Sequence, residues 1–167
     1  MTTIFRIFAA FSVAALPISA AAQDWQLIVQ PPNVFGTTRV VAWTTAYDRI
    51  DHLQVICDDK TPPKIHVLED MSDPKDVTAQ GIRLILRGAG DPVSAVGDSE
   101  WWNNTTYSMV EIADPDTVQA MLDVIARAPG RVDGGLVLPN GDQYPMTFPS
   151  DNGAAAVAQI RSHCPTR

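Results

Sequence analysis

The chain has 167 residues, of which 46% are hydrophobic and 19% charged, and its formal net charge is −7. This length favours one domain, and this composition is that of a globular protein rather than a disordered one. With 12 Lys+Arg against 19 Asp+Glu, the chain lacks the cationic surface that holds phosphates. We therefore expect no nucleic-acid or anionic-lipid partner, whereas a basic partner stays open.

The N-terminus has the pattern of an export signal. Arg6 is followed by an apolar run of 12 residues, 7–18, and Ala20, Ala21 and Ala22 precede Gln23. The run is shorter than the roughly 20 residues that a membrane-crossing helix needs, so a cleaved signal is favoured over a retained anchor. We predict a signal peptide over 1–22 and a single globular domain over 23–167, periplasmic or secreted, with no transmembrane segment. Loss of Arg6 changes the formal charge from −7 to −8.

Cys57 and Cys164 are the only cysteines of the chain. Export delivers both thiols to an oxidising compartment, where thiols pair. We therefore predict an intramolecular Cys57–Cys164 disulfide. Because the pair is not a Cys-x-x-Cys motif, the bond is expected to be structural rather than catalytic.

The first half of the exported chain has strand patterns separated by turn residues. The predicted strands are 25–30, 39–47, 50–57, 65–68 and 82–86. The short Asp48–Arg49 link predicts a hairpin between the second and third of them. Gly, Pro and Asp content predicts a turn at 58–63, a loop at 69–81 and a long surface loop at 88–99. A sixth strand is predicted at 105–112.

Asp114–Pro115 predicts a helix start, because a carboxylate accepts free backbone N–H groups and proline suits the first helical position. Apolar residues at helical spacing follow, at Val118, Met121, Leu122 and Ile125, and Pro129–Gly130 ends the run.

The chain closes with a second hairpin and a second helix. Asn140–Gly141 is a turn signal between strand patterns at 135–138 and 144–148. Ser150 is the expected cap of the closing helix, whose Val157, Ile160 and Cys164 share one face. The whole pattern predicts an α+β fold: a mainly antiparallel sheet, curled or sandwich-like, with two helices, the last tied to the sheet by the disulfide.

No pattern in the sequence marks a catalytic, metal or cofactor site. His52, His66 and His163 lack zinc-ligand spacing, and no nucleophile elbow, calcium loop or phosphate-binding glycine loop occurs. The acidic clusters of the loops are expected to be solvated. We predict no catalytic residue, no metal ligand and no cofactor.

The four tryptophans separate into two kinds. Trp25 and Trp43 lie in strand patterns and are expected in the core. Trp101 and Trp102 are neighbours, and neighbours on a strand point to opposite faces, so at most one is buried against the same core. A candidate binding patch therefore comprises Trp101, Trp102, Asn103 and Tyr107. The alternative is a loop that folds back over both rings.

Dispersed positions resemble a known type of protein. They are Trp25 soon after the signal, an apolar strand ending in Cys57, and a closing segment with Phe148, Gly153, Ala156, Ile160 and Cys164. This outline resembles small exported proteobacterial proteins of two families, the invasion-associated locus B group and the periplasmic accessory proteins of type VI secretion. The chain departs from both at Pro31–Pro32 and in the glycine-rich loop before Trp101. The resemblance implies an exported, disulfide-bridged, non-enzymatic protein.

The sequence predicts a non-catalytic exported protein that binds a protein or a cell-envelope component, as an accessory of secretion or host interaction. The neighbouring acids of the patch favour a basic or amide-rich partner. The alternative is a small periplasmic hydrolase with a scattered active site. A deep pocket that holds His52 or His66 against a carboxylate and a hydroxyl would favour the hydrolase. A flat aromatic patch near Trp102 would favour binding.

Overall fold

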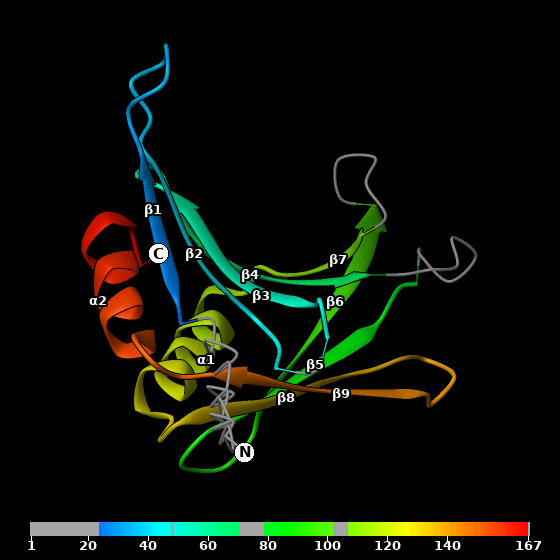
Figure 1. Cartoon of the computed structure of the whole chain (residues 1–167). Coiled ribbons are helices and arrows are strands. Elements are labelled where there is room, and N and C mark those ends of the chain that lie inside the picture. The colour runs from blue at the N-terminus through cyan, green and yellow to red at the C-terminus, as the bar shows by residue number, and fades with distance from the viewer. Residues whose placement is uncertain (1–23, 48, 71–78, 102–106, 167) are drawn as a thin grey trace, which may run out of the picture.

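The computed structural model describes residues 24–47, 49–70, 79–101 and 107–166 (Figure 1). The side chains of Asp70 and Trp101 are outside this description, as is the predicted signal peptide. The elements are β1 (Gln26–Gln30), β2 (Arg39–Thr45), β3 (His52–Asp58), β4 (Thr61–Asp70), β5 (Ile82–Arg87), β6 (Val93–Trp101), β7 (Tyr107–Ile112), α1 (Pro115–Arg127), β8 (Arg131–Val137), β9 (Gln143–Pro149) and α2 (Gly153–His163).

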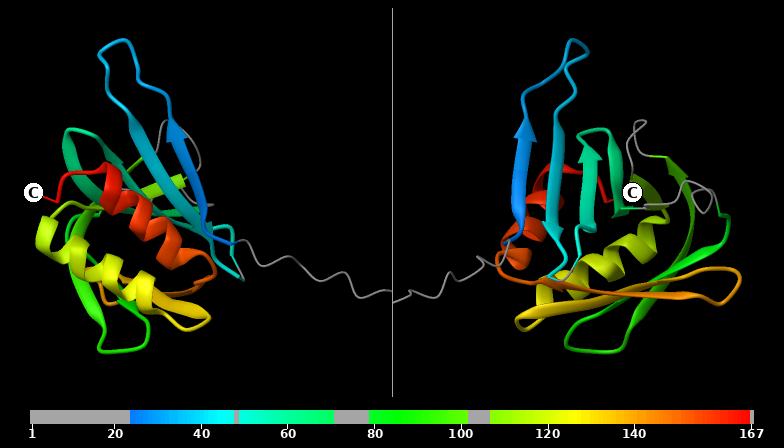
Figure 2. Two further views of the ribbon diagram at one scale, coloured as in Figure 1. Left: turned by 90° about the vertical axis from the view of Figure 1, so that its left-hand side faces the viewer. Right: turned by 45° about the vertical axis from the view of Figure 1, so that its right-hand side comes forward.

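The nine strands form one antiparallel sheet in the order β1-β2-β3-β4-β7-β6-β5-β8-β9. The sheet curls, with β1–β4 at one end and β5, β8 and β9 at the other, and α1 and α2 lie side by side against it (Figures 1 and 2). The two ends meet where Tyr47 N donates to Thr147 O at 2.9 Å and Trp25 Nε1 donates to Pro149 O at 3.0 Å. The sheet remains open, and β1 is an edge strand.

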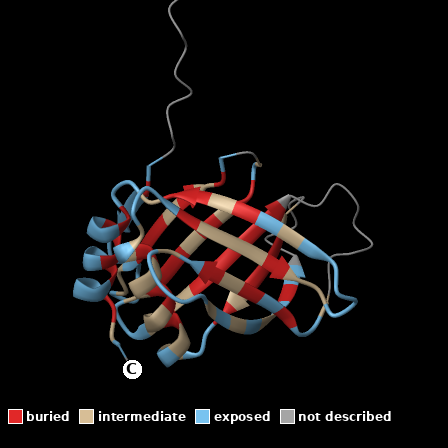
Figure 3. Cartoon of the chain, turned by 90° about the horizontal axis from the view of Figure 1, so that it is seen from below, coloured by how far each residue is buried: buried red, intermediate tan, exposed pale blue. Residues whose placement is uncertain are grey.

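The core lies between the curled sheet and the two helices. Buried and more exposed residues alternate along several strands (Figure 3), as expected when one face of a sheet is buried. On β3 the core residues are Leu53, Val55 and Cys57. Helix α1 contributes the predicted Val118, Met121, Leu122 and Ile125 to the same core.

The fold class and most elements agree with the sequence predictions. The domain is α+β with two helices, and the two predicted hairpins pair as β2–β3 and β8–β9. Asp114 caps α1, accepting a hydrogen bond from Thr117 N at 2.9 Å, and Pro115 is the first helical residue. Gly141 has φ 93° in the Asn–Gly turn, a backbone conformation that glycine adopts without strain. Among the described residues, no helix is long and apolar enough to cross a bilayer.

The predicted loop at 88–99 is wrong, because β6 occupies Val93–Trp101. Gly97, which suggested a loop, lies where β6 comes close to β7, and a Cβ there would collide with the backbone oxygen of Glu111. The glycine therefore permits close strand packing rather than a turn. Seven strands, not the predicted six, precede α1.

Two smaller predictions are also wrong. Strand β4 begins at Thr61, inside the predicted turn at 58–63, and continues through Asp70 into the predicted loop at 69–81, of which 71–78 lies outside the described residues. Helix α2 is capped by Asn152, in the left-handed conformation at φ 62°, and not by Ser150. Ser150 instead accepts from Gly153 N through its backbone oxygen at 2.8 Å.

The predicted disulfide is confirmed, since Cys57 of β3 is bonded to Cys164 at the end of α2. It closes a loop with a sequence separation of 107. Cross-linking a loop of about 100 residues removes chain entropy from the unfolded state, worth on the order of 4 to 5 kcal/mol in that model.

We predict that replacing both Cys57 and Cys164 by Ala lowers the free energy of unfolding by about 4 kcal/mol in urea titrations. Reduced native protein is the matched control and should show a similar loss. Thiol titration of the denatured, unreduced protein should find no free thiol. Two reactive thiols per chain would contradict the bond.

Candidate functional site

The side of the sheet that faces away from α1 and α2 is here called the outer face. Because inward and outward residues alternate along a strand, the inward Leu53, Val55 and Cys57 of β3 leave His52, Gln54 and Ile56 on the outer face. Neither of the two described helices covers this face over β1–β4 (Figures 1 and 2). Its chemistry is therefore set by which outward side chains the strand registers bring together.

The registers arrange the outward side chains in two contrasting rows. A polar row crosses five strands and consists of Trp43, Gln54, His66, Glu111 and Asp98. An apolar row lies beside it and ends in a cation; it consists of Ile28, Val41, Ile56 and Lys64. Side chains directly opposite on neighbouring strands are in contact range, so each row acts as a continuous strip.

Two adjoining pockets of about 380 Å³ and about 510 Å³ lie over these rows. They share Gln30, Arg39 and Ile56, and together they form one depression, here called the trough. Its lining includes Ile28, Gln30, Arg39, Val41, Trp43, His52, Gln54, Ile56, Lys64, His66, Leu68 and Glu111. Ile56 is only 7% exposed although no helix covers it, because neighbouring outward side chains shield the floor.

An ion-pair network lies at the β4–β7 side of the trough. Lys64 Nζ donates to Glu111 Oε1 at 2.8 Å, and His66 Nε2 lies 3.0 Å from Glu111 Oε2. Burial raises the pKa of Glu111, but hydrogen bonds from Lys64 and His66 outweigh burial and leave that pKa below its ordinary value. Burial, together with the charges of Lys64 and Arg39, lowers the pKa of His66, although Glu111 opposes the shift.

An aromatic cluster lies at the other side of the trough. The rings of Trp43 and His52 meet edge to face, with centroids 5.5 Å apart, and His52 and Tyr107 lie 5.8 Å apart. Thr45 Oγ1 lies 2.9 Å from His52 Nδ1. Burial lowers the pKa of His52, while Asp51 opposes the shift. The prediction that Trp43 belongs to the core is wrong: it is half-buried on the outer face, whereas Trp25 is 5% exposed and belongs to the core as predicted.

Gln54 contributes a buried polar atom between these two groups. Its Oε1 is buried and accepts no hydrogen bond from the described part of the chain. A buried acceptor without a donor is costly, because it has lost water without replacement. Gln54 lines the trough, so a donor on a bound molecule would satisfy it.

A buried acidic pair lies next to the aromatic cluster, and the sequence analysis missed it. Asp51 and Glu69 are 1% and 4% exposed, and Arg49 bridges them at 2.7 Å and 3.3 Å. Burial and the charge of Asp51 raise the pKa of Glu69, while Arg49 opposes the shift. The sequence signal for this pair was the opposite charges of Arg49 and Asp51 just before a strand. Such a pattern also occurs in ordinary turns.

The predicted patch is only partly described. Tyr107 begins β7, is half-buried and contacts His52. Trp101 ends β6 and pairs with Ser108 through the backbone, while Trp102 and Asn103 lie outside the described residues. The structure thus connects Tyr107 to Trp43 and His52, two residues that the sequence analysis did not assign to the patch.

A histidine held against both a carboxylate and a hydroxyl would favour a hydrolase. In the structure, each of these two contacts is made by a different histidine. His66 contacts the carboxylate of Glu111, whereas His52 contacts the hydroxyl of Thr45. The two histidines lie on neighbouring strands, with His52 opposite Leu68 and His66 opposite Gln54. Within the described ranges, no group of three or more His, Cys, Asp or Glu residues is placed to hold a metal ion.

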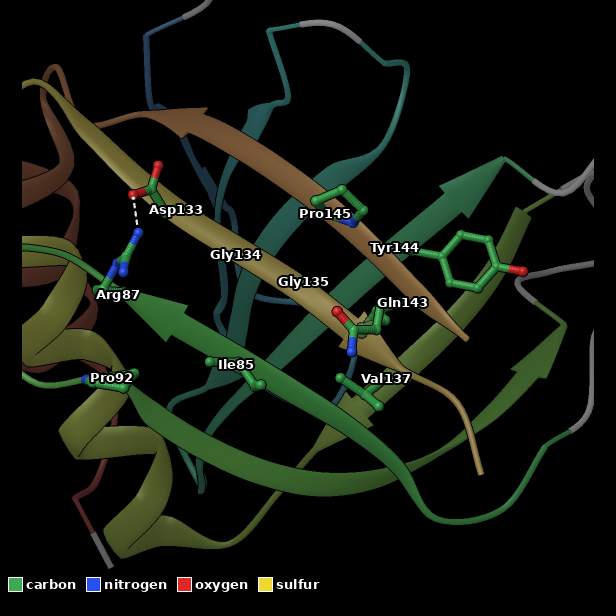
Figure 4. Close-up of a pocket in the computed structure, with 11 residues that line it drawn as sticks. Ile85, Arg87, Pro92, Asp133, Gly134, Gly135, Val137, Gln143, Tyr144 and Pro145 are labelled. Carbon is green, nitrogen blue, oxygen red and sulfur yellow. Dashed lines mark hydrogen bonds and ion pairs between the residues drawn. The ribbon is translucent and has the colours of Figure 1, made fainter. Parts of the chain in front are cut away.

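A second groove of about 350 Å³ lies over β5, β8 and β9 (Figure 4). Gly134 and Gly135 contribute no side chains to it, and Arg87 pairs with Asp133 across it at 3.0 Å. The buried Gln54 Oε1, which accepts no hydrogen bond from the described residues, lies in the trough and not in this groove. The trough is therefore the stronger candidate site.

Comparisons with protein-family models, with curated proteins and with solved structures find no match to this chain.

The histidines of the trough predict a pH-dependent stability. Because the folded state lowers the pKa of His52 and His66, the unfolded chain takes up protons that the folded chain does not, below the ordinary pKa of about 6.5. The free energy of unfolding should therefore fall as the pH falls from about 7.5 to about 5.5.

Replacing both His52 and His66 by Gln should flatten this dependence in urea titrations across the same pH range. The exposed His163→Gln is the matched control and should keep the wild-type slope. An unchanged slope in the double variant would contradict the assignment.

Proposed function

We propose that this chain is an exported, non-catalytic protein that binds a protein or cell-envelope component in the trough. The observation that carries the proposal is the buried, unsatisfied Gln54 Oε1 in an open depression. Native proteins satisfy nearly all buried polar atoms, so such an acceptor fits a partner that supplies an N–H or O–H group.

The aromatic cluster supports the same proposal. Trp43 and His52 line the trough, and the ring of Tyr107 lies beside that of His52. Aromatic side chains provide large contact area with little rotamer entropy to lose, and they dominate many interfaces. Tyr107 belongs both to this cluster and to the predicted patch, of which Trp102, Asn103 and the side chain of Trp101 lie outside the described residues.

Charge favours a basic or amide-rich partner. Glu111 and Asp98 are opposite each other on β7 and β6, and Glu100 follows on the same face of β6. Lys64 is paired with Glu111 and Arg39 also lines the trough, so the excess of carboxylates lies beside the trough, at Asp98 and Glu100 of β6. Opposite charge at an interface mainly raises the association rate and selects the partner.

The location follows from two features of different kinds. A signal-like N-terminus predicts export, and the Cys57–Cys164 bond suits an oxidising compartment. A periplasmic or secreted protein of this size, with a binding face and a structural disulfide, agrees with a role as an accessory of secretion or host interaction. The resemblance to the locus B and type VI accessory proteins contributes to this part of the proposal.

We predict that a photo-reactive benzoylphenylalanine in place of Trp43, which lines the trough, cross-links a defined partner in intact cells. The same residue in place of exposed Val96 should not, because Val96 lies outside the trough lining. The partner, once purified, should bind Trp43→Ala and Gln54→Leu at least about 10-fold more weakly than wild type, as for loss of an interface anchor. Equal cross-linking from both positions, or full affinity of both variants, would contradict the proposal.

Separate Trp101→Ala and Trp102→Ala variants test the extension of the patch. If both rings close the core, each variant should lose about 3 to 5 kcal/mol of unfolding free energy. We expect instead that at least one variant keeps its melting temperature and loses affinity for the cross-linked partner. A large stability loss in both would remove these residues from the binding surface.

A further inference from the structure

The exposed apolar side chains of the described residues concentrate on β1 and the loop that follows it. They include Leu27, Ile28, Val29, Val34 and Phe35, which are 37%, 47%, 45%, 93% and 82% exposed. All five residues of β1 are exposed, and one side of the strand has no neighbour in the sheet. An apolar edge strand presents unpaired backbone groups to another strand, which is a template for association.

Charged side chains, which protect many edge strands from pairing with another chain, do not occur in this segment. No Asp, Glu, Lys or Arg occurs from Trp25 to Thr38, although the chain carries a formal charge of −7. Two copies of an acidic protein repel each other over most of their surfaces, so an uncharged edge is where they approach at least cost. Pro31 and Pro32 limit the length of the edge but lie outside β1.

The opposite edge of the sheet is protected. Strand β9 contains Pro145 and Pro149, which cannot donate backbone hydrogen bonds, and this is a common protection of edge strands. The backbone of Thr147 also accepts from Tyr47 N at 2.9 Å. The contrast indicates that β1, and not β9, is the edge available for pairing.

The sequence of β1 is self-complementary. Gln26-Leu27-Ile28-Val29-Gln30 has the same pattern in both directions about Ile28. In an antiparallel pair related by a two-fold axis at Ile28, Gln26 faces Gln30 of the second copy, Leu27 faces Val29, and Ile28 faces Ile28. A two-fold interface uses the same patch on both subunits, so a sequence with this symmetry suits it.

The same register places the inward residues of the two copies on one face of the joined sheet and their outward residues on the other. Leu27 and Val29 are opposite the core residues Ala42 and Val40 of β2, and Ile28 is opposite the outward Val41. Pairing about Ile28 therefore joins helix side to helix side and outer face to outer face. Helix α2 lies near this edge (Figure 1), and its small exposed Ala154, Ala155 and Ala158 leave room for a second copy.

We propose that β1 pairs antiparallel with β1 of a second copy about a two-fold axis at Ile28, giving a closed homodimer with a continuous sheet. The helix layers add contact area beyond the strands, toward the roughly 1,000 Å² of a specific interface. Since Ile28 and Gln30 also line the trough, the dimer places two troughs beside each other on one face. This proposal stands without the proposed function, because it rests on the edge strand alone.

Light scattering on the purified native protein tests the dimer. We expect twice the monomer mass at about 100 µM, since dimers are populated by mass action. Ile28→Lys sets two ammonium groups opposite each other at the axis, so its dimer dissociation constant should rise at least about 10-fold, because like charges directly opposite destabilise strand pairs. The matched control is Val96→Lys on β6, which should remain dimeric with an unchanged circular dichroism spectrum.

Cross-linking tests the position of the axis and decides the case if Ile28→Lys does not fold. Ile28→Cys should form a disulfide-linked dimer under oxidation, because the residue faces its own copy. Gln30→Cys should not, because Gln30 faces Gln26. A monomeric wild type, an open series of oligomers, an Ile28→Lys dimer of unchanged affinity, or no Ile28→Cys cross-link would each overturn the proposal.

Discussion

The structure depends on how few helices there are to cover a large sheet. The described residues form two helices and nine strands, and strand residues alternate between the two sides of a sheet. The sheet therefore curls around α1 and α2 so that its ends share one core with them, and Trp25 contacts β9 across the opening. The side facing away from the helices is left without a covering layer. The Cys57–Cys164 bond holds α2 to the inner side and so keeps this division.

The uncovered side explains where the candidate surfaces lie. Neighbouring side chains on adjacent strands shield one another, so the outward residues of β2, β3, β4 and β7 are not all solvated. Ile56 and Leu68, for example, are each 7% exposed. The result is a half-buried face with an apolar row, a polar row and a buried acceptor on Gln54. At the edge of the same sheet, β1 has no neighbouring strand on one side and carries no charged residue. The half-buried outer face and the unpaired edge of β1 both belong to the same open sheet.

Local signals predicted the elements that local chemistry controls. Asp114–Pro115 begins α1, and Asn140–Gly141 turns the β8–β9 hairpin, because capping and positive φ depend on a few adjacent residues. The disulfide was predictable from the presence of only two cysteines. Strand β6 was not, because Gly97 suggests a turn until its close approach to β7 is known.

The candidate site depended on strand register, which the sequence does not specify locally. Trp43 was assigned to the core because an aromatic residue in a strand pattern is usually buried; the register places it opposite Gln54, on the outer face. His66 meets Glu111 over a sequence separation of 45. Among the described residues of the predicted patch, Tyr107 joins it to this surface through its contact with His52.

The central claim is that the trough is an open surface which a partner covers. It is tested most directly by hydroxyl-radical labelling of side chains, in which the oxidation of Trp43, Trp25 and Val96 is compared. In the purified protein, the account predicts strong oxidation of half-buried Trp43 and weak oxidation of buried Trp25. In intact cells that contain the partner, labelling of Trp43 should fall, whereas labelling of exposed Val96 should not change. Equal labelling of Trp43 in both settings would contradict the account.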